Sequence, residues 1–183
     1  MEDLDGIISV EQVIEDEDVV ESIERGDTKV ICLLGGTGVG KSSLANTLTC
    51  KKGAFKTSAD LKSETDETKG VVTSMEHKGR IYQSMIIDTP GYGDTEGRDS
   101  IHTAKMILSL KSIKTVNAFI VCLNSSDTRI DVNKQGYLKL LSQMFGGEKF
   151  YKHVLICFTK WDFDKKGRMM RQIGVQLSEA KLI

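Results

Sequence analysis

The fold of this chain is decided by the stretch Gly35-Gly36-Thr37-Gly38-Val39-Gly40-Lys41-Ser42-Ser43. This stretch satisfies the spacing GxxxxGK[ST], and it stands between an apolar run at 30–34 and a helix-compatible run at 44–48. Main-chain N–H groups in such a loop turn inward toward phosphate oxygens, which requires dihedral angles that glycine tolerates. The N-terminus of the following helix adds a favourable dipole. The stretch therefore predicts a phosphate-binding loop between a strand and a helix.

Two side chains of this loop have separate expected roles. Lys41 supplies a cation to the β- and γ-phosphates, and the Ser42 hydroxyl is placed to coordinate Mg²⁺. The other expected nucleotide contacts come from the rest of the loop and the first helical turn, namely Gly36, Thr37, Gly38, Val39, Gly40 and Ser43. A plain glycine-rich turn is the alternative interpretation, and the full spacing argues against it.

Composition limits the classes of protein to consider. The 183 residues suit one domain, and the net charge of -1 gives no basic field that would favour nucleic acid. The four cysteines are far apart in the sequence, which favours reduced core residues over disulfides or a metal site. No signal peptide and no apolar run of about 20 residues is present, so we expect no membrane span and a cytoplasmic setting.

From residue 29 onward the pattern alternates between strands and helices, which predicts a three-layer α/β fold with a mostly parallel sheet. Most of the expected strands are continuous apolar runs, as strands buried on both faces are. We expect strands at 30–34, 71–77, 84–88, 118–124 and 154–159, and helices at 41–49, 100–111, 134–145 and 166–182. The second strand alternates and leads into the turn Lys78-Gly79-Arg80, so we expect it to pair antiparallel with the third.

Residues 1–28 form an acidic N-terminal extension. Several valines and isoleucines of 10–23 fall on one helical face, Ser9 and Gln12 have the spacing of a capping box, and Gly26 follows. We expect a short helix packed beside the domain formed by 29–183. A disordered acidic leader is the alternative that composition leaves open.

The sequence Asp88-Thr89-Pro90-Gly91 closes the apolar run 85–87. Its carboxylate therefore lies at the carboxyl end of a buried strand, where ligands bind in open α/β sheets. Asp88 is expected to hold Mg²⁺ through water, and the N–H of Gly91 is expected to meet the γ-phosphate.

The sequence Thr159-Lys160-Trp161-Asp162 closes the run 154–158 and matches the pattern [NT]KxD. A single carboxylate, that of Asp162, accepts both the N1–H and the N2–H of guanine, whereas adenine presents an acceptor at N1. A site built in this way rejects the wrong base by about 10⁴ or more. The stem of Lys160 is expected to lie over the purine ring, so the ligand is predicted to be a guanine nucleotide.

A nucleotide switch also needs a mobile threonine whose hydroxyl reaches Mg²⁺ only when the γ-phosphate is present. The polar stretch 62–70 offers candidates, of which Thr68 is our choice. Thr65 and Thr73 remain alternatives.

With these motifs in order, residues 29–165 resemble the septin-like branch of GTPases. They most closely resemble the avirulence-induced or immunity-associated nucleotide-binding family, a relative of the plastid import receptor GTPases. The features that carry the resemblance are Thr37, Thr68-Lys69, and the stretches 88–95, 117–131 and 146–159. The resemblance implies a G domain that binds GTP and GDP with Mg²⁺ and dimerises across its nucleotide face. In such a domain Lys41, Thr68 and Gly91 would serve hydrolysis, while Ser42, Thr68 and Asp88 would hold the metal.

Two features depart from related patterns. Tyr92 stands where Ras-like enzymes place a glutamine that orients water, so we expect slow hydrolysis, completed by a partner or by a loop near Arg98 or Arg129. After Asp162 only 21 residues remain, so we expect the closing strand and helix to be missing and a sheet edge to be exposed. The stretch 178–181 resembles a base-contacting loop but comes too early in the chain.

The expected function is a guanine-nucleotide switch with slow GTP hydrolysis. The first alternative is a septin-like scaffold whose assembly is controlled by GTP with little turnover. The second is an ATP-using enzyme, against which Asp162 argues. Any contact with a membrane would need a part of the protein outside this chain.

Overall fold

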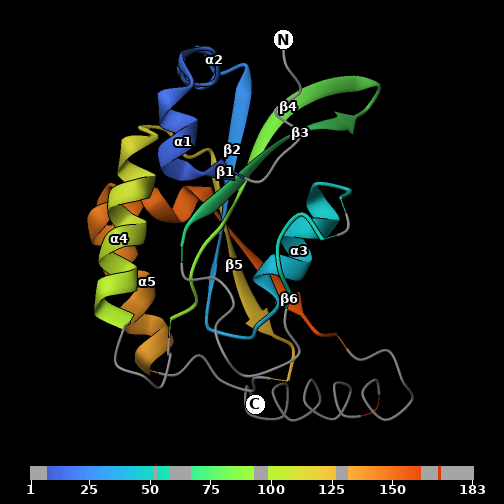
Figure 1. Cartoon of the computed structure of the whole chain (residues 1–183). Helices are drawn as coiled ribbons and strands as arrows, with labels where there is room; N and C mark the ends of the chain where they lie inside the picture. The colour runs from blue at the N-terminus through green and yellow to red at the C-terminus, as the bar shows by residue number, and fades with distance from the viewer. Residues whose placement is uncertain are drawn as a thin grey trace.

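A twisted β-sheet runs through the middle of the molecule (Figure 1). The computed structural model describes residues 8–51, 53–57, 67–92, 99–126, 132–161 and 169. Within these residues the sheet has six strands in the order β1-β3-β4-β2-β5-β6. The strands are β1 (Ile8–Ser9), β2 (Thr28–Gly35), β3 (Lys69–His77), β4 (Arg80–Asp88), β5 (Ala118–Asn124) and β6 (Val154–Thr159). All five predicted strands are therefore present, and β1 was not predicted.

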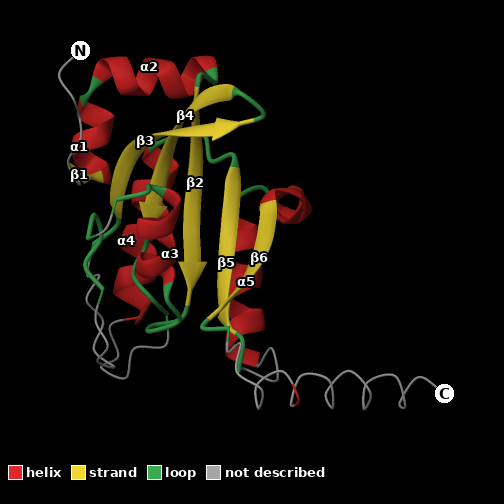
Figure 2. Cartoon of the chain, turned by 90° about the vertical axis from the view of Figure 1, so that its right-hand side faces the viewer, coloured by secondary structure: helices red, strands yellow, loops and turns green. Residues whose placement is uncertain are grey.

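The central strands are parallel, as their continuous apolar runs predicted. β2 lies between β4 and β5, and β5 pairs with β6, all in parallel (Figure 2). The register sets Leu33 opposite Asp88 and Asn124 opposite Thr159. Because parallel strands end at the same edge of a sheet, this register brings the phosphate-binding loop, Asp88 and Thr159 to one edge.

The predicted antiparallel pair is confirmed. β3 pairs with β4 from Lys69 opposite Asp88 to His77 opposite Arg80, and the turn between them holds Lys78 and Gly79 at positive φ. The unpredicted β1 lies antiparallel to β3 at the outer side of this pair. A two-residue strand shows no periodicity, so the sequence pattern could not reveal it.

Helices cover both faces of the sheet, which makes the three predicted layers (Figure 1). One face carries α3 (Lys41–Leu48), and a small apolar core formed around Ala45 and Phe55 lies under it. The larger core lies under the helices of the other face. These are α1 (Val10–Glu15), α2 (Glu17–Arg25), α4 (Asp99–Ser112), α5 (Val132–Met144) and the short helix η1 (Gly147–His153). Within the described residues, no helix is long and apolar enough to cross a membrane.

The N-terminal extension contributes to this larger core. Val10 and Val13 of α1 are completely buried, and Val19 and Ile23 of α2 are nearly so. The sequence pattern predicts one helix here, whereas the structure has two. Asp16 divides them because its side chain accepts a hydrogen bond from the N–H of Val19 and so begins a new helix.

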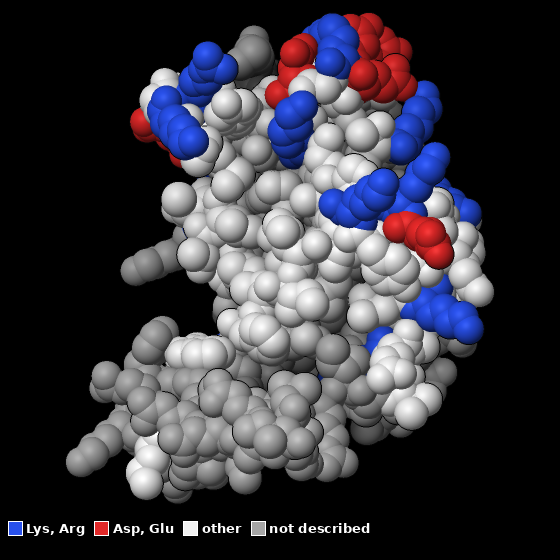
Figure 3. All heavy atoms as spheres, turned by 180° about the vertical axis from the view of Figure 1, so that it is seen from behind, with Lys and Arg blue, Asp and Glu red and all other residues white. Residues whose placement is uncertain are grey.

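β6 lies at the end of the sheet, and among the described residues it pairs only with β5. Leu155, Ile156 and Phe158 are each more than half exposed. Seen from behind, the middle of the molecule shows mostly uncharged side chains (Figure 3). The predicted helix 166–182 and the expected loss of the closing elements concern residues outside the described part, apart from Met169.

Candidate functional site

The phosphate-binding loop connects β2 to α3, as the motif predicts. Gly38 and Gly40 have φ angles of 72° and 97°, in the left-handed region that residues with a Cβ rarely adopt. A Cβ added at Gly38 would meet no atom within 4 Å, so this part of the loop borders open space. Positive φ at these two glycines is the backbone conformation that a phosphate-binding loop requires.

The side chain of Lys41 extends back toward the start of the loop. This side chain is only 6% exposed, and Nζ donates a hydrogen bond of 3.0 Å to the carbonyl of Gly36. Burial lowers the pKa of Lys41, and the charge of Asp88 acts in the opposite direction. Nζ of Lys41 therefore lies beside the loop backbone, where an anionic ligand would favour the charged form of Lys41.

Ser42 and Asp88 are in direct contact. The Ser42 hydroxyl donates a hydrogen bond of 2.6 Å to Oδ2 of Asp88, which is the last residue of β4 and almost fully buried. A hydroxyl and a carboxylate are the hard oxygen ligands that Mg²⁺ prefers, and Mg²⁺ takes few ligands from the protein. The two residues expected to coordinate or support the metal therefore lie together.

Thr68 comes immediately before β3, and its side chain is 5% exposed. The next residue, Lys69, pairs with Asp88, so Thr68 lies close to the end of β4. Thr73 lies farther along β3, where its hydroxyl faces the carbonyl of Thr49 at 3.4 Å. Thr65 lies outside the described residues. Of the two described candidates, Thr68 is the one placed beside Ser42 and Asp88, the pair expected to hold the metal.

Gly91 lies directly against the loop. A Cβ at Gly91 would come within 2.5 Å of the backbone nitrogen and Oγ1 of Thr37. The N–H of Thr37 donates to the carbonyl of Tyr92 at 3.0 Å, and Gly36 forms an isolated bridge with Tyr92. Oγ1 of Thr37 is buried and has no hydrogen-bond partner among the residues that the structure describes. A buried hydroxyl without a partner costs free energy, so a ligand atom that bonds to it would be favoured.

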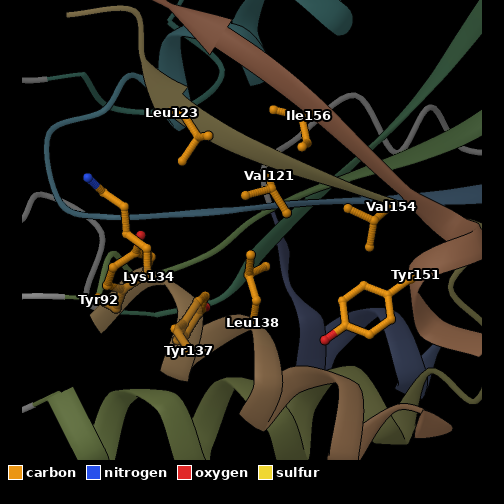
Figure 4. Close-up of a pocket in the computed structure, with 9 residues that line it drawn as sticks. All are labelled: Tyr92, Val121, Leu123, Lys134, Tyr137, Leu138, Tyr151, Val154 and Ile156. Carbon is orange, nitrogen blue, oxygen red and sulfur yellow. The ribbon is translucent and has the colours of Figure 1, made fainter. Parts of the chain in front are cut away.

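The side chain of Tyr92 packs against α5, and its Cζ lies 3.8 Å from the position that a Cβ at Gly36 of the loop would occupy. Its ring lies 4.2 Å from that of Tyr137, whose hydroxyl faces the sulfur of Met106 at 3.6 Å. Burial raises the pKa of Tyr137. The two rings line an apolar pocket of about 110 Å³ beside β5 and β6 (Figure 4). The contact between the two rings was not predicted because no spacing in the sequence relates Tyr92 to Tyr137.

The end of β6 also touches the loop. The hydroxyl of Thr159 lies within hydrogen-bond distance of the carbonyls of Val39 and Leu123. Lys160 has a φ angle of 51°, and its carbonyl accepts a hydrogen bond of 2.8 Å from the hydroxyl of Ser125. Ser125 also donates its N–H to the carbonyl of Thr159. Ser125, which directly follows β5, thus fixes the backbone of Thr159 and Lys160, the start of the predicted guanine motif 159–162. The sequence did not suggest this role for Ser125.

The remaining predicted residues divide into two groups. Ser43 is in the first turn of α3 with an exposed side chain, and the partly buried Val39 packs near Gly35 and Gly36. Asp162, Arg98 and Arg129 lie outside the described residues. Three segments far apart in the sequence therefore meet at one edge of the sheet, and Asp162, the predicted base-reading carboxylate, comes soon after the last of them in the sequence.

Comparisons with known proteins agree with this arrangement. The family model described as AIG1 family matches residues 29–174. The chain is 31% identical to a probable GTP-binding protein EngB of Bacteroides thetaiotaomicron over 177 residues, covering 94% of this chain and 79% of the relative. It is also 35% identical to human Septin-9 over 78 residues, which cover 40% of this chain and 13% of that protein.

Among solved structures, a dimerization-deficient mutant of Toc33 from Arabidopsis thaliana superposes with a TM-score of 0.60 at 21% identity. The match covers 84% of this chain and 59% of the Toc33 chain. Toc33 has also been solved with Mg²⁺ and GMPPNP, and dimerization is important for its GTPase activity. At this identity the likeness shows the fold alone. With the family match over most of its length, the chain belongs to the AIG1 family, in the septin-like branch of P-loop GTPases.

Proposed function

We propose that this chain is a guanine-nucleotide switch that binds GTP and GDP with Mg²⁺ and hydrolyses GTP slowly by in-line attack of water. The observation that carries the proposal is the meeting of three segments at one edge of the sheet. Ser42 of the loop contacts Asp88 at 2.6 Å, and Thr159 of the guanine motif contacts the carbonyl of Val39. The second contact joins the proposed phosphate-binding loop to the end of the strand that leads into the proposed base site.

The loop and the metal-binding pair would hold the phosphates. Lys41 would turn Nζ from the carbonyl of Gly36 to the β- and γ-phosphates, and main-chain N–H groups of 36–43 would bind the phosphate oxygens. Ser42 and Thr68 would coordinate Mg²⁺, with Asp88 acting through water. When bound, Mg²⁺ neutralises charge on the phosphate oxygens.

Two residues would distinguish GTP from GDP. Gly91 would offer its N–H to the γ-phosphate, and its contact with Thr37 would transmit that event to the loop. Thr68 would reach the metal only in the GTP state. The nucleotide state would thereby be reported by two segments that flank the loop.

Base selection would come from the end of β6. Thr159 and Ser125 fix the backbone from which Lys160 would lie over the purine, and Asp162 would accept the two guanine N–H groups. The EngB relative is a probable GTP-binding protein, and Toc33 has GTPase activity, which supports the same nucleotide for this chain.

Hydrolysis would be slow because the residue after Gly91 is Tyr92, which has no side-chain amide. Tyr92 packs its ring against Tyr137, and a phenol offers no amide group to orient water. We propose that a second copy completes the site in a dimer, with Arg98 or Arg129 as the candidate groups. The Toc33 structures support this idea, since dimerization is important for GTPase activity there. We further propose a cytoplasmic location, in keeping with four free cysteines.

The experiment measures GTP turnover per molecule at increasing protein concentration, together with nucleotide affinity. Tight binding of GTP and GDP in Mg²⁺, with turnover that rises with concentration, is expected. Absence of guanine-nucleotide binding would refute the proposal, while turnover independent of concentration would refute completion by a dimer.

A septin-like scaffold controlled by GTP is the second candidate. The packing of Tyr92 against Tyr137 favours it because a phenol at this position would not orient the attacking water, and the likeness to Septin-9 agrees. Assembly on a non-hydrolysable GTP analogue, with no measurable turnover at any concentration, would establish the scaffold in place of the hydrolytic switch.

A further inference from the structure

The N-terminal extension contacts the chain at the proposed switch threonine. Ile8 pairs with Gly70 and Ser9 with Lys69, and the N–H of Val10 points to the carbonyl of Thr68 at 3.4 Å. β1 thus lies along the first two residues of β3, which directly follow Thr68. On its other side the same stretch is paired with the end of β4, where Lys69 faces Asp88.

β1 is itself held firmly in place. The N–H of Ser9 donates to Oε1 of Gln12 at 2.9 Å, and the hydroxyl of Ser9 accepts from the N–H of Gln12. This capping box begins α1 directly after β1. Val10 and Val13 are completely buried in the same core as Met106 of α4. The segment is therefore an anchored part of the domain and not a loose leader.

We infer that β1 and the N–H of Val10 are positioning elements for Thr68. The inference rests on the proposed function, in which the Thr68 hydroxyl reaches Mg²⁺ only in the GTP state. The carbonyl of Thr68 accepts a hydrogen bond from Val10, and the next residue, Lys69, is paired with both Ser9 and Asp88. Thr68 therefore has less main-chain freedom to lose when GTP orders it. The extension therefore favours GTP over GDP without touching either nucleotide.

Val10→Pro tests this inference because it removes one donor at a position that tolerates proline. Val10 is the first residue of α1, where the N–H makes no intrahelical bond, and Ser9 already has the extended conformation that precedes proline. The matched control is Val10→Ala, which also shortens the side chain but keeps the N–H.

The measurement compares the affinities of a fluorescent non-hydrolysable GTP analogue and of fluorescent GDP, both with Mg²⁺, in the two variants and the natural chain. Val10→Pro is expected to lower the preference for the GTP analogue over GDP about fivefold, the factor that one hydrogen bond of ordinary net strength represents. Val10→Ala is expected to keep the preference. In a Thr68→Ala background, Val10→Pro is expected to have no further effect on it.

Hydrogen exchange of the natural chain gives a second readout that needs no variant and no turnover. The GTP analogue, but not GDP, is expected to slow exchange of the Val10 amide. The inference is overturned by equal preferences in Val10→Pro and Val10→Ala, or, if Val10→Pro does not fold, by equal exchange of the Val10 amide with both nucleotides. A natural chain that binds neither nucleotide would instead refute the proposed function.

Discussion

Gly91 and Thr37 are in contact across the site, with no room between them for even a methyl group. A Cβ at Gly91 would overlap the Thr37 backbone, which is itself bonded to Tyr92. The glycine of the second motif is therefore required by close approach to the phosphate-binding loop as well as by any contact with a ligand.

Gly91→Ala is accordingly expected to push the segment 91–92 off the loop. Affinity for a GTP analogue should fall at least about tenfold, equivalent to losing one charge-assisted hydrogen bond, with a smaller effect on GDP. Isothermal titration with both nucleotides measures the difference. Gly136→Ala is the control, since an added Cβ there meets no atom within 4 Å. An equal loss for both nucleotides would contradict a specific role in the GTP state.

Ser42→Ala removes the hydroxyl that contacts Asp88. In the nucleotide-free protein, loss of this bond to a buried carboxylate should lower the free energy of unfolding by about 1.5–3 kcal/mol. In the complex, loss of a metal ligand should raise the Mg²⁺ concentration needed for tight GDP binding. Urea unfolding and Mg²⁺ titration of GDP release measure the two effects. Ser43→Ala, one residue along with an exposed side chain, should leave the Mg²⁺ requirement unchanged.

Asp162→Asn should change which base is bound. Guanine would lose the acceptor for its two N–H groups, and its binding should weaken by about 10³ or more. Xanthine, which presents a carbonyl at C2, should gain a donor from the new amide. Competition between GDP and xanthosine diphosphate measures the preference, with Asp164→Asn as the control. Unchanged preference for guanine in Asp162→Asn would show that this carboxylate does not read the base.

The cysteines should differ sharply in reactivity. Burial raises the pKa of Cys122 from 9.0 to about 12 and also raises the pKa of Cys32, whereas Cys50 is exposed. Because the thiolate is the reactive form, iodoacetamide near pH 8 should label Cys50 first and Cys32 and Cys122 only after unfolding. Mass spectrometry of digests, with and without urea, locates the label. Rapid labelling of Cys122 in the folded protein would contradict its placement.

The raised pKa of Cys122 also predicts how the stability of the fold depends on pH. Above pH 9.0 the unfolded chain loses the Cys122 proton, while the folded chain keeps it until pH about 12. The unfolded state then binds fewer protons, so the free energy of unfolding should fall as pH rises through this window. Cys122→Ala should show a weaker decline in urea unfolding over the same range. An identical decline in both proteins would assign it to other groups.

Much of the fold followed from the sequence because its signals are local. Continuous apolar runs marked the parallel strands, and the glycine spacing marked the loop. The predicted residues Ser42, Asp88 and Thr159 came together because each stands at the end of a strand or the start of a helix. Motifs at such positions are brought to one edge by the topology alone.

What the sequence did not reveal depends on contacts between distant residues. Tyr92 packs against Tyr137, and Ser125 donates a hydrogen bond to the carbonyl of Lys160. No periodic spacing in the sequence relates the residues of either pair. β1 consists of two residues, too short for any pattern, and its partner is in another part of the chain. The break at Asp16 was missed because the apolar positions continue through it on the same face.

The pairing of β1 with β3 also has a consequence for biosynthesis. Val10 and Val13 leave the ribosome before their partners in β3 and α4 are made. These apolar side chains must stay uncovered while the intervening chain is translated, which exposes the nascent chain to aggregation and gives chaperones a target. The Thr68 region can therefore be completed only when β3, once it has been made, pairs with the earlier-made β1.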